Sequence, residues 1–282
     1  MMDYFDKFLV APDSKVDLSK VDPSFKDTHE NHKSALPEIQ ANSQKLGELQ
    51  HLMYAENKRS LLICLQGRDA AGKDGTINHV LGAVNPQGCT VTGFKVPSKE
   101  EAAHDFLWRC HKAVPAKGQF AIFNRSHYED VLVVRVHNLV PKKIWERRFD
   151  HINAFEELLH DNDTHILKFF LHISPDEELR RFKERIDDPA RQWKISEADY
   201  AERPYWDAYT EAFEDALGKC SKKHAPWFVI PGNHKWFRNL AISKILCEYL
   251  TSLDMKYPEP TVDLEEIKKK YHQAEKTESE LE

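Results

Sequence analysis

Short apolar runs of strand length alternate along the chain with longer stretches in which apolar residues recur at helical spacing. The first run, at 60–66, is almost wholly apolar and stops at a glycine, which is typical of a strand buried on both faces of a parallel sheet. Four further runs predict strands at 89–94, 119–123, 165–173 and 227–230. The stretches around them predict helices at 37–57, 72–84, 99–112, 145–160 and 235–250.

A further helix start lies directly after the fourth predicted strand. Ser174 suits the N-cap, Pro175 the first helical position and Glu177 the third, which together form a capping box. Strands that alternate with helices imply right-handed crossovers and a parallel sheet with helices on both faces. Ligands of such folds bind at the carboxyl ends of the strands, so the residues that follow each strand are the site candidates.

The same pattern divides the chain into three parts. Residues 1–35 are polar without a sustained period and predict an extended or mixed N-terminal arm. Residues 36–255 carry the alternating strands and helices of one domain. Residues 256–282 are highly charged and predict a peripheral helix and tail.

Composition narrows the function classes only a little. The 282 residues are 41% hydrophobic and 30% charged, as in an ordinary globular protein, and no apolar run reaches the roughly 18–20 residues of a membrane span. The start lacks the basic-then-apolar order of a signal peptide, and five cysteines without a CxxC pair suit reduced, buried thiols. A net charge of −6 argues against nucleic acid as a partner. We therefore expect a cytoplasmic protein that binds neither membranes nor nucleic acid.

The loop after the first strand carries the clearest chemistry. Gly67-x-x-x-x-Gly72-Lys73 fits a P-loop between a strand and a helix, where glycines let successive N–H groups point at phosphate oxygens. The start of the helix adds its positive dipole end, and Lys73 supplies a cation for a transferring phosphoryl group. The alternative is a strand–helix turn that merely requires glycine. The residues expected to bind phosphate here are Gly67, Arg68, Ala70, Ala71, Gly72, Asp74, Gly75 and Thr76.

Two aspartates make this P-loop unusual. Asp74 occupies the eighth position, where Ser or Thr normally binds the magnesium of a nucleotide, and Asp69 lies within the loop. Carboxylates beside a phosphate chain are unfavourable unless a divalent cation bridges them. We therefore expect Mg²⁺, with Mn²⁺ as a substitute, held by Asp69. For Asp74, a charge that complements the helix N-terminus is an equal alternative.

A second cluster, at 123–130, follows the third strand. Asn124 stands where a Walker B carboxylate is usual, and the guanidinium of Arg125 suits phosphate. Glu129 is a candidate metal ligand or proton acceptor. We expect Arg125 and Glu129 to act with Asp69 and Lys73 in catalysis. His127 is interpreted mainly as a hydrogen-bonding strut.

A basic segment follows the capping box. Arg185, Arg191 and Lys194 flank a helix break at Asp187-Asp-Pro, and P-loop kinases use such a segment as a closing lid. We expect the lid at about 178–200, with these three cations on phosphate; a salt-bridged solvated helix is the alternative. Together with the P-loop, the pattern predicts a P-loop kinase-like three-layer α/β/α sandwich with a five-stranded parallel sheet and a helical lid.

The two clusters together resemble the polyphosphate kinase 2 family. The matching text is Leu-Gln-Gly-Arg-Asp-Ala-Ala-Gly-Lys-Asp-Gly-Thr at 65–76, Phe-Asn-Arg-Ser-His-Tyr-Glu-Asp at 123–130 and Asp-Asp-Pro-Ala-Arg-Gln-Trp-Lys-Ile-Ser at 187–196, with Val96-Pro-Ser and His104-Asp-Phe-Leu-Trp-Arg109 between them. The resemblance runs from about residue 35 to 255.

This resemblance implies reversible phosphoryl transfer between inorganic polyphosphate and AMP, ADP or ATP, with magnesium and in a homo-oligomer, either a dimer or a tetramer. Asp69 would bind metal, and Lys73 and Arg125 would contact phosphate. The form of the second cluster is closer to the class III branch, whose members accept both AMP and ADP. Members that use a nucleoside diphosphate often carry Asp at the position of Asn124, so Asn124 is a weaker candidate ligand. Glu129 is our candidate to replace that role or to assist AMP.

The chain also resembles thymidylate-kinase-like enzymes, which have an acceptor loop after the second strand. On that likeness Phe94 or Pro97 would flank a base, whereas Lys95 and Arg109 would meet the acceptor's phosphates; for Phe94, a plain core position is an equal alternative. An ATP-dependent nucleoside monophosphate kinase is therefore the alternative function. A non-catalytic polyphosphate or nucleotide sensor is the third.

Overall fold

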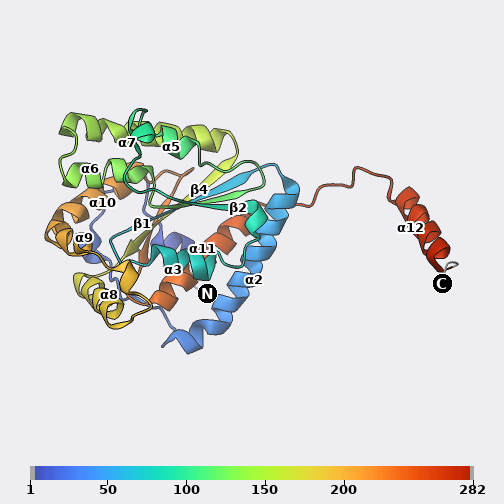
Figure 1. Ribbon diagram of the computed structural model, residues 1–282, viewed down its shortest axis with the longest axis horizontal. Coiled ribbons are helices and arrows are strands. Elements are labelled where there is room, and N and C mark those ends of the chain that lie inside the picture. Colours follow the sequence, from blue (N-terminus) through green and yellow to red (C-terminus); the bar gives the residue numbers. More distant parts are fainter. Residues whose placement is uncertain (1–3, 280–282) are drawn as a thin grey trace.

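The computed structural model describes residues 4–279, and at its centre is a five-stranded sheet (Figure 1). The strand order is β2-β3-β1-β4-β5, and every neighbouring pair is parallel. The predicted fold class is confirmed, and each of the five predicted strands is present within two residues of its expected bounds. The strands are β1 (Ser60–Gly67), β2 (Cys89–Gly93), β3 (Phe120–Asn124), β4 (Thr164–His172) and β5 (Trp227–Pro231).

Helices surround this sheet, and one further helix, α12 (Leu264–Ser279), lies apart from it (Figure 1). The longer ones are α2 (His32–Glu56), α3 (Lys73–Val80), α7 (Lys142–Asp161), α8 (Pro175–Asp187), α10 (Trp206–Cys220) and α11 (Lys235–Ser252). The short ones are α1 (Tyr4–Phe8), α4 (Lys99–Ala102), α5 (Trp108–His111), α6 (Val133–Val136) and α9 (Glu197–Ala201). The 3-10 turns are η1 (Leu18–Lys20), η2 (Pro86–Gly88), η3 (His127–Asp130), η4 (Gln192–Lys194) and η5 (Arg203–Tyr205).

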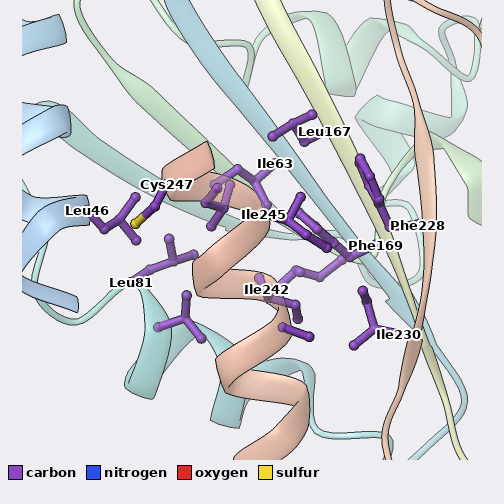
Figure 2. Packing of buried hydrophobic residues seen from close by; sticks show 14 of the residues in the cluster. Leu46, Ile63, Leu81, Leu167, Phe169, Phe228, Ile230, Ile242, Ile245 and Cys247 are labelled. Carbon is purple, nitrogen blue, oxygen red and sulfur yellow. The ribbon is translucent and has the colours of Figure 1, made fainter. Parts of the chain in front are cut away.

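Alternate residues of the strands build two cores, one on each face of the sheet. Ile63 of β1 and Phe169 of β4 belong to the core covered by α2, α3 and α11, where Ile242 and Ile245 of α11 lie against the sheet (Figure 2). Cys64 of β1, in contrast, belongs to a core that includes residues of α7. A strand buried on both faces is apolar at most positions, which explains the apolar run from Leu61 to Leu65 in β1.

The chain leaves neighbouring strands in opposite directions at one sheet edge. From β1 it enters α3, which packs in the core of one face, whereas from β3 it passes through η3 and α6 to α7 on the other face. Diverging connections of this kind leave a crevice at the carboxyl ends of the strands. The P-loop and the 123–130 cluster both border that crevice.

The described part of the predicted N-terminal arm packs closely on the domain. Tyr4 and Phe8 of α1 are buried, and the N–H of Val10 donates to the carbonyl of Trp227 in β5 (2.8 Å). The helix expected at 37–57 begins earlier, at His32, because Asn31 and Ser34 form a capping box there. Pro37 lies inside this helix, so that proline does not mark its start.

Two predictions of helices need correction. The helix expected at 99–112 is split into α4 and α5, because Asp105 accepts a hydrogen bond from the N–H of Leu107 (3.0 Å) in a local turn that interrupts the helix. Helix α10 was not predicted, although Phe213 and Leu217 on one of its faces are buried.

At the other end of the chain, α12 stands away from the domain at the end of an extended segment (Figure 1). This agrees with the predicted peripheral helix. The five cysteines are all free and four are buried, as expected. Within residues 4–279, every helix is too short or too polar to cross a membrane.

Candidate active site

The P-loop turns sharply between β1 and α3. Gly72 has φ +104°, and a Cβ atom there would lie 1.8 Å from Nη1 of Arg238, so only glycine fits. Ala70 is also left-handed, at φ 55°. A non-glycine residue in this region is strained, and such strain is held in place by the surrounding contacts.

Lys73 folds back over this loop. Its Nζ donates to the carbonyls of Gly67 (2.7 Å) and Arg68 (3.1 Å), and the residue is only 9% exposed. Burial and the nearby Arg125 guanidinium lower the pKa of Lys73 to about 8. The lysine is therefore held at the centre of the loop as a cation that a phosphate group would stabilise.

Arg125 comes from the end of β3 and meets the P-loop. Its guanidinium donates to Asp69 (2.8 Å), and its backbone is left-handed at φ 61°. This conformation turns the chain sharply after β3 and begins the segment that leads into η3. Glu129 in η3 accepts a hydrogen bond from Gln66 of β1 (3.0 Å). Both predicted members of the second cluster thus border the phosphate loop.

The side chains of Asp69, Arg125 and Glu129 line one small cavity of about 50 Å³. It lies between the P-loop, the turn after β3 and the region where α8, η5 and α10 approach them. The lining residues are Gly67, Arg68, Asp69, Arg125, Glu129, Leu132, Glu178, Glu202, Arg203, Trp206, Tyr209 and Phe213. Carboxylates and guanidinium groups therefore face the same space, in which each kind can bind the opposite charge of a metal–phosphate complex.

Asn124, at the end of β3, contacts Asp74, the P-loop residue in the first turn of α3. The amide of Asn124 donates to Oδ1 of Asp74 (2.8 Å), and Nζ of Lys194 lies 3.6 Å from Oδ2 of Asp74. Lys194 of the predicted lid thus reaches the P-loop. Arg185 and Arg191 instead pair with residues of the predicted lid itself, Asp199 (3.7 Å) and Asp188 (2.9 Å) respectively.

The residues present fit magnesium held mainly by substrate. Among residues 4–279, no group of three or more His, Cys, Asp or Glu side chains forms a metal cage. Asp69 offers a carboxylate in the lining of the cavity, and Asn124, whose amide nitrogen donates to Asp74, also carries an amide oxygen. Mg²⁺ is typically bound by one or two protein oxygens together with substrate phosphates and water, which matches this sparse donor set.

Several predicted residues have other partners in the structure. The guanidinium of Arg68 lies 3.6 Å from the ring of Trp206 and donates to Thr210 (2.6 Å), so it connects the P-loop to α10. Arg109 is buried and donates to the carbonyl of Lys95 (2.7 Å), and it lies over the ring of Phe94. Phosphate binding by Arg68 and Arg109 stays a prediction that requires these contacts to rearrange.

The predicted acceptor loop is partly core. Phe94 is 4% exposed and packs edge-on against Phe123 (4.7 Å between ring centroids), which leaves little of the ring for a nucleobase. Lys95 and Pro97 are exposed and remain available to an acceptor. A base contact by Pro97 and phosphate contacts by Lys95 stay predictions.

Two arginines that were not singled out for the site hold the P-loop from behind. Arg181 of α8 donates to the carbonyls of Ala70 (2.8 Å) and Ala71 (2.9 Å), and Arg238 of α11 donates to that of Ala71 (3.1 Å). Both are nearly fully buried, and burial beside Arg181 lowers the pKa of Arg238 to about 9. The C=O and N–H groups of a peptide unit point in opposite directions. By binding the loop carbonyls on one side, the two guanidinium groups keep the loop N–H groups pointing toward the other side, where phosphate would bind.

We expect Arg181→Lys to destabilise the protein by about 2–3 kcal/mol, because a lysine cannot reproduce several charge-assisted hydrogen bonds to the loop. Turnover should fall with it. Chemical denaturation and initial rates measure the two effects. The matched control is Arg180→Lys, since Arg180 is half exposed and pairs along the same helix surface; it should change stability by less than about 0.5 kcal/mol. Equal losses of stability in Arg181→Lys and Arg180→Lys would contradict the role of Arg181 in holding the P-loop.

Behind the second cluster lies a buried charged network. Glu156 of α7 accepts from His127 (3.0 Å) and Tyr128 (2.9 Å) of η3, and Lys168 of β4 lies 2.5 Å from its other oxygen. His127, Glu156 and Lys168 are all 0% exposed. The interpretation of His127 as a strut agrees with this placement, since the network fixes η3 and so the side chain of Glu129.

A Gly-rich loop with its lysine, set between a buried strand and a helix and faced by an arginine paired with an aspartate, defines a P-loop phosphotransferase. The family model described as Polyphosphate kinase 2 matches residues 28–258. The chain belongs to the polyphosphate kinase 2 family.

Full-length relatives agree with this assignment. The chain is 48% identical to the AMP/ADP-polyphosphate phosphotransferase of Meiothermus ruber, over 93% of this chain and 98% of that protein. It is 43% identical to the ADP-polyphosphate phosphotransferase of Rhodopseudomonas palustris, over 90% of this chain and 92% of that protein. The crystal structure of Polyphosphate Kinase 2 from Arthrobacter aurescens TC1 superimposes with a TM-score of 0.93 at 39% identity, over 96% of this chain and 97% of that one.

Proposed function

We propose that the protein is a polyphosphate-dependent nucleotide kinase that transfers a phosphoryl group from inorganic polyphosphate to AMP and ADP, reversibly and with Mg²⁺. The observation that carries this proposal is the meeting of Asp69, Lys73 and Arg125 at the carboxyl ends of β1 and β3. Acceptance of both AMP and ADP follows the name of the Meiothermus ruber relative and would place the chain in class III.

In the proposed reaction, the terminal phosphoryl group of the polyphosphate lies over the P-loop. The loop N–H groups and Lys73 bind its oxygens, and Arg125 neutralises charge beside it. The acceptor phosphate enters from the side of Lys95. Its oxygen forms a new P–O bond as the P–O bond to the polyphosphate chain breaks in line, and the shortened chain leaves as an anion. Because the attacking oxygen is already anionic, positioning and charge neutralisation supply most of the acceleration.

Magnesium, when bound, neutralises charge on the phosphates, and Mn²⁺ can substitute for it. Asp69 is the residue that would hold it, with the amide oxygen of Asn124 as a second ligand. Glu129 would replace Asn124 as a ligand or assist AMP, and its position in the lining of the same cavity as Asp69 supports this proposal. Of the lid cations, Lys194 is the one already directed at the loop.

The test is a donor and acceptor matrix read by chromatography. AMP and ADP are each incubated with polyphosphate or with ATP as the sole phosphoryl donor, with Mg²⁺ present. We expect ADP and ATP to form from polyphosphate. Phosphorylation of AMP by ATP alone would favour a nucleoside monophosphate kinase, and tight binding of polyphosphate without turnover would favour a sensor.

We expect Asp69→Asn to lower kcat by about 100-fold or more, because it removes the carboxylate proposed for the metal. The fold should survive, since an amide still accepts a hydrogen bond from Arg125. Initial rates against Mg²⁺ concentration and a thermal melt measure both. Asp163→Asn, an exposed carboxylate at the start of β4, is the matched control. Near-normal activity of Asp69→Asn would refute the metal assignment.

We further propose a cytoplasmic homo-oligomer, dimer or tetramer, on the basis of family resemblance. Multi-angle light scattering of the purified protein decides the oligomeric state. The charge of −6 supports the expectation that nucleic acid is not a partner.

A further inference from the structure

Asp74 uses its two carboxylate oxygens in different directions. Oδ1 accepts a hydrogen bond from the amide of Asn124 (2.8 Å), and Oδ2 lies 3.6 Å from Nζ of Lys194. One side chain thus joins three parts of the chain: the first turn of α3, the end of β3 and the end of η4 in the lid. Ser or Thr at this position is too short to make such a bridge.

Asn124 is the complement that this arrangement requires. Its amide nitrogen donates to Asp74 and fixes the carboxylate so that the second oxygen faces the lid. A carboxylate at 124 would have no donor for Asp74, and two carboxylates in contact repel each other. The pairing therefore explains both departures from the usual P-loop pattern, the Asp at the eighth position and the Asn after β3.

Lys194 differs from its neighbours in the lid. Arg185 pairs with Asp199 and Arg191 pairs with Asp188, so both cations have partners within the lid segment. Lys194 instead has its carboxylate partner outside the lid segment, at Asp74 of the P-loop. This ion pair is the contact through which the lid cation is held at the place where phosphate binds.

We propose that Asp74 is a positioning residue that latches the empty lid onto the P-loop through Lys194 and releases Lys194 when the polyphosphate donor binds. The proposal deepens the proposed function, because the donor's phosphate is what takes over Lys194. The side chains of Lys194 and Asp74 are 36% and 62% exposed. An ion pair this exposed shifts an equilibrium by about fivefold at most, so the latch holds the lid yet opens readily.

The latch competes with the substrate for the same cation. Donor binding requires Lys194 to leave Asp74, and the carboxylate then remains near a polyanion. Removal of the charge at 74 should therefore loosen the empty lid and, at the same time, tighten donor binding. A residue that merely supports the fold, or one that binds metal, would weaken donor binding when it is neutralised.

Hydrogen–deuterium exchange of the ligand-free full-length protein measures the latch directly. We expect Asp74→Asn to speed amide exchange within 188–199 by about threefold to fivefold. The KM for polyphosphate should fall by a similar factor. Lys194→Met should speed exchange equally but raise the KM, because the donor loses a cation. Lys183→Met, an exposed lysine that pairs within the lid, is the control and should leave exchange across 188–199 unchanged.

The double variant Asp74→Lys with Lys194→Asp re-forms the ion pair with the charges exchanged. It should therefore restore the slow amide exchange of the wild type. Its KM for polyphosphate should still differ from that of the wild type, because the lid no longer offers the cation at 194 to the donor. Unchanged exchange in Asp74→Asn overturns the proposal. A raised KM for polyphosphate together with a raised Mg²⁺ requirement would also overturn it, in favour of a metal ligand. Amide exchange is measured without substrate, whereas the proposed kinase activity is measured with it. The proposed latch can therefore be refuted while the kinase activity is confirmed, and the reverse result is equally possible.

Discussion

Lys73→Met is expected to abolish nearly all turnover and yet to make the protein more stable at pH 7. The loss of rate should reach about 1,000-fold, because the lysine is the cation that we propose at the transferring phosphoryl group. The gain in stability follows from the pKa of Lys73, which burial and Arg125 lower to about 8 from 10.5. At pH 7 the folded protein must keep a buried charge that the unfolded chain holds in water.

The size and pH dependence of this gain are set by the two pKa values. A difference of this size corresponds to about 3 kcal/mol. The loss of two hydrogen bonds to loop carbonyls offsets part of it, so we expect a gain of about 1–3 kcal/mol. Below pH 8 the cost of burying the charge of Lys73 in the wild type is constant, because Lys73 is protonated in both the folded and the unfolded state. Between pH 8 and 10.5 the unfolded chain binds more protons than the folded one, so wild-type stability rises and the advantage of the variant shrinks.

Urea denaturation across this pH range and initial rates at pH 7 measure the two effects. Lys183→Met is the control, since it removes an exposed lysine and should change neither stability nor turnover appreciably. A Lys73→Met protein that is less stable than wild type at pH 7 would contradict the electrostatic account. A variant with normal turnover would contradict the role in phosphoryl transfer.

Lys168→Met is expected to have the largest effect on stability. The ammonium of Lys168 is buried and contacts the carboxylate of Glu156 (2.5 Å), the hydroxyl of Tyr128 (2.9 Å) and the carbonyl of Cys220 (2.7 Å). Its removal leaves the carboxylate of Glu156 without its cation in the core. Breaking one side of a buried pair typically costs about 3–5 kcal/mol, and we expect a loss of that size in urea denaturation.

The double change Glu156→Gln with Lys168→Met should recover part of this loss, because no uncompensated charge then remains buried. The single variant should also depend on pH in a distinct way. Burial raises the pKa of Glu156, but Lys168 and His127 together hold it below its usual value. Without Lys168 that pKa rises, so the variant should regain stability as the pH falls and Glu156 takes up a proton. Additive effects of the two single changes would contradict the coupling.

The sequence was a good guide to the sheet and to the phosphate loop, for a physical reason. A parallel strand buried on both faces is apolar at most positions, so β1 and β4 are visible in the sequence itself, although the buried Lys168 interrupts β4. The P-loop is equally visible, because glycine and lysine must stand at fixed places in a short segment. The split helix between α4 and α5 was not visible, since its break depends on one local hydrogen bond of Asp105.

The supporting contacts of the site could not be predicted in the same way. Arg181 and Ala71 are 110 residues apart, and Arg68 and Thr210 are 142 apart, so no local pattern links them. The signal available for Arg181 was weak, since it lies among several charged residues of one helix. The bridge at Asp74 was hidden for the same reason. The sequence showed an unusual residue there, but only the fold brings Asn124 and Lys194 to it.

The docking of the first residues also constrains when the domain can be completed during synthesis. The hydroxyl of Ser221 donates to the carbonyl of Val10 across 211 residues, and α1 packs against β5 and α11. These partners come much later in the chain, so α1 cannot complete its packing until β5 and α11 have been made. Such long-range closure slows folding and lengthens the time for which apolar surface is exposed. A nascent chain paused before residue 227 would therefore lack β5 and α11, on which α1 packs, and would leave Tyr4 and Phe8 exposed.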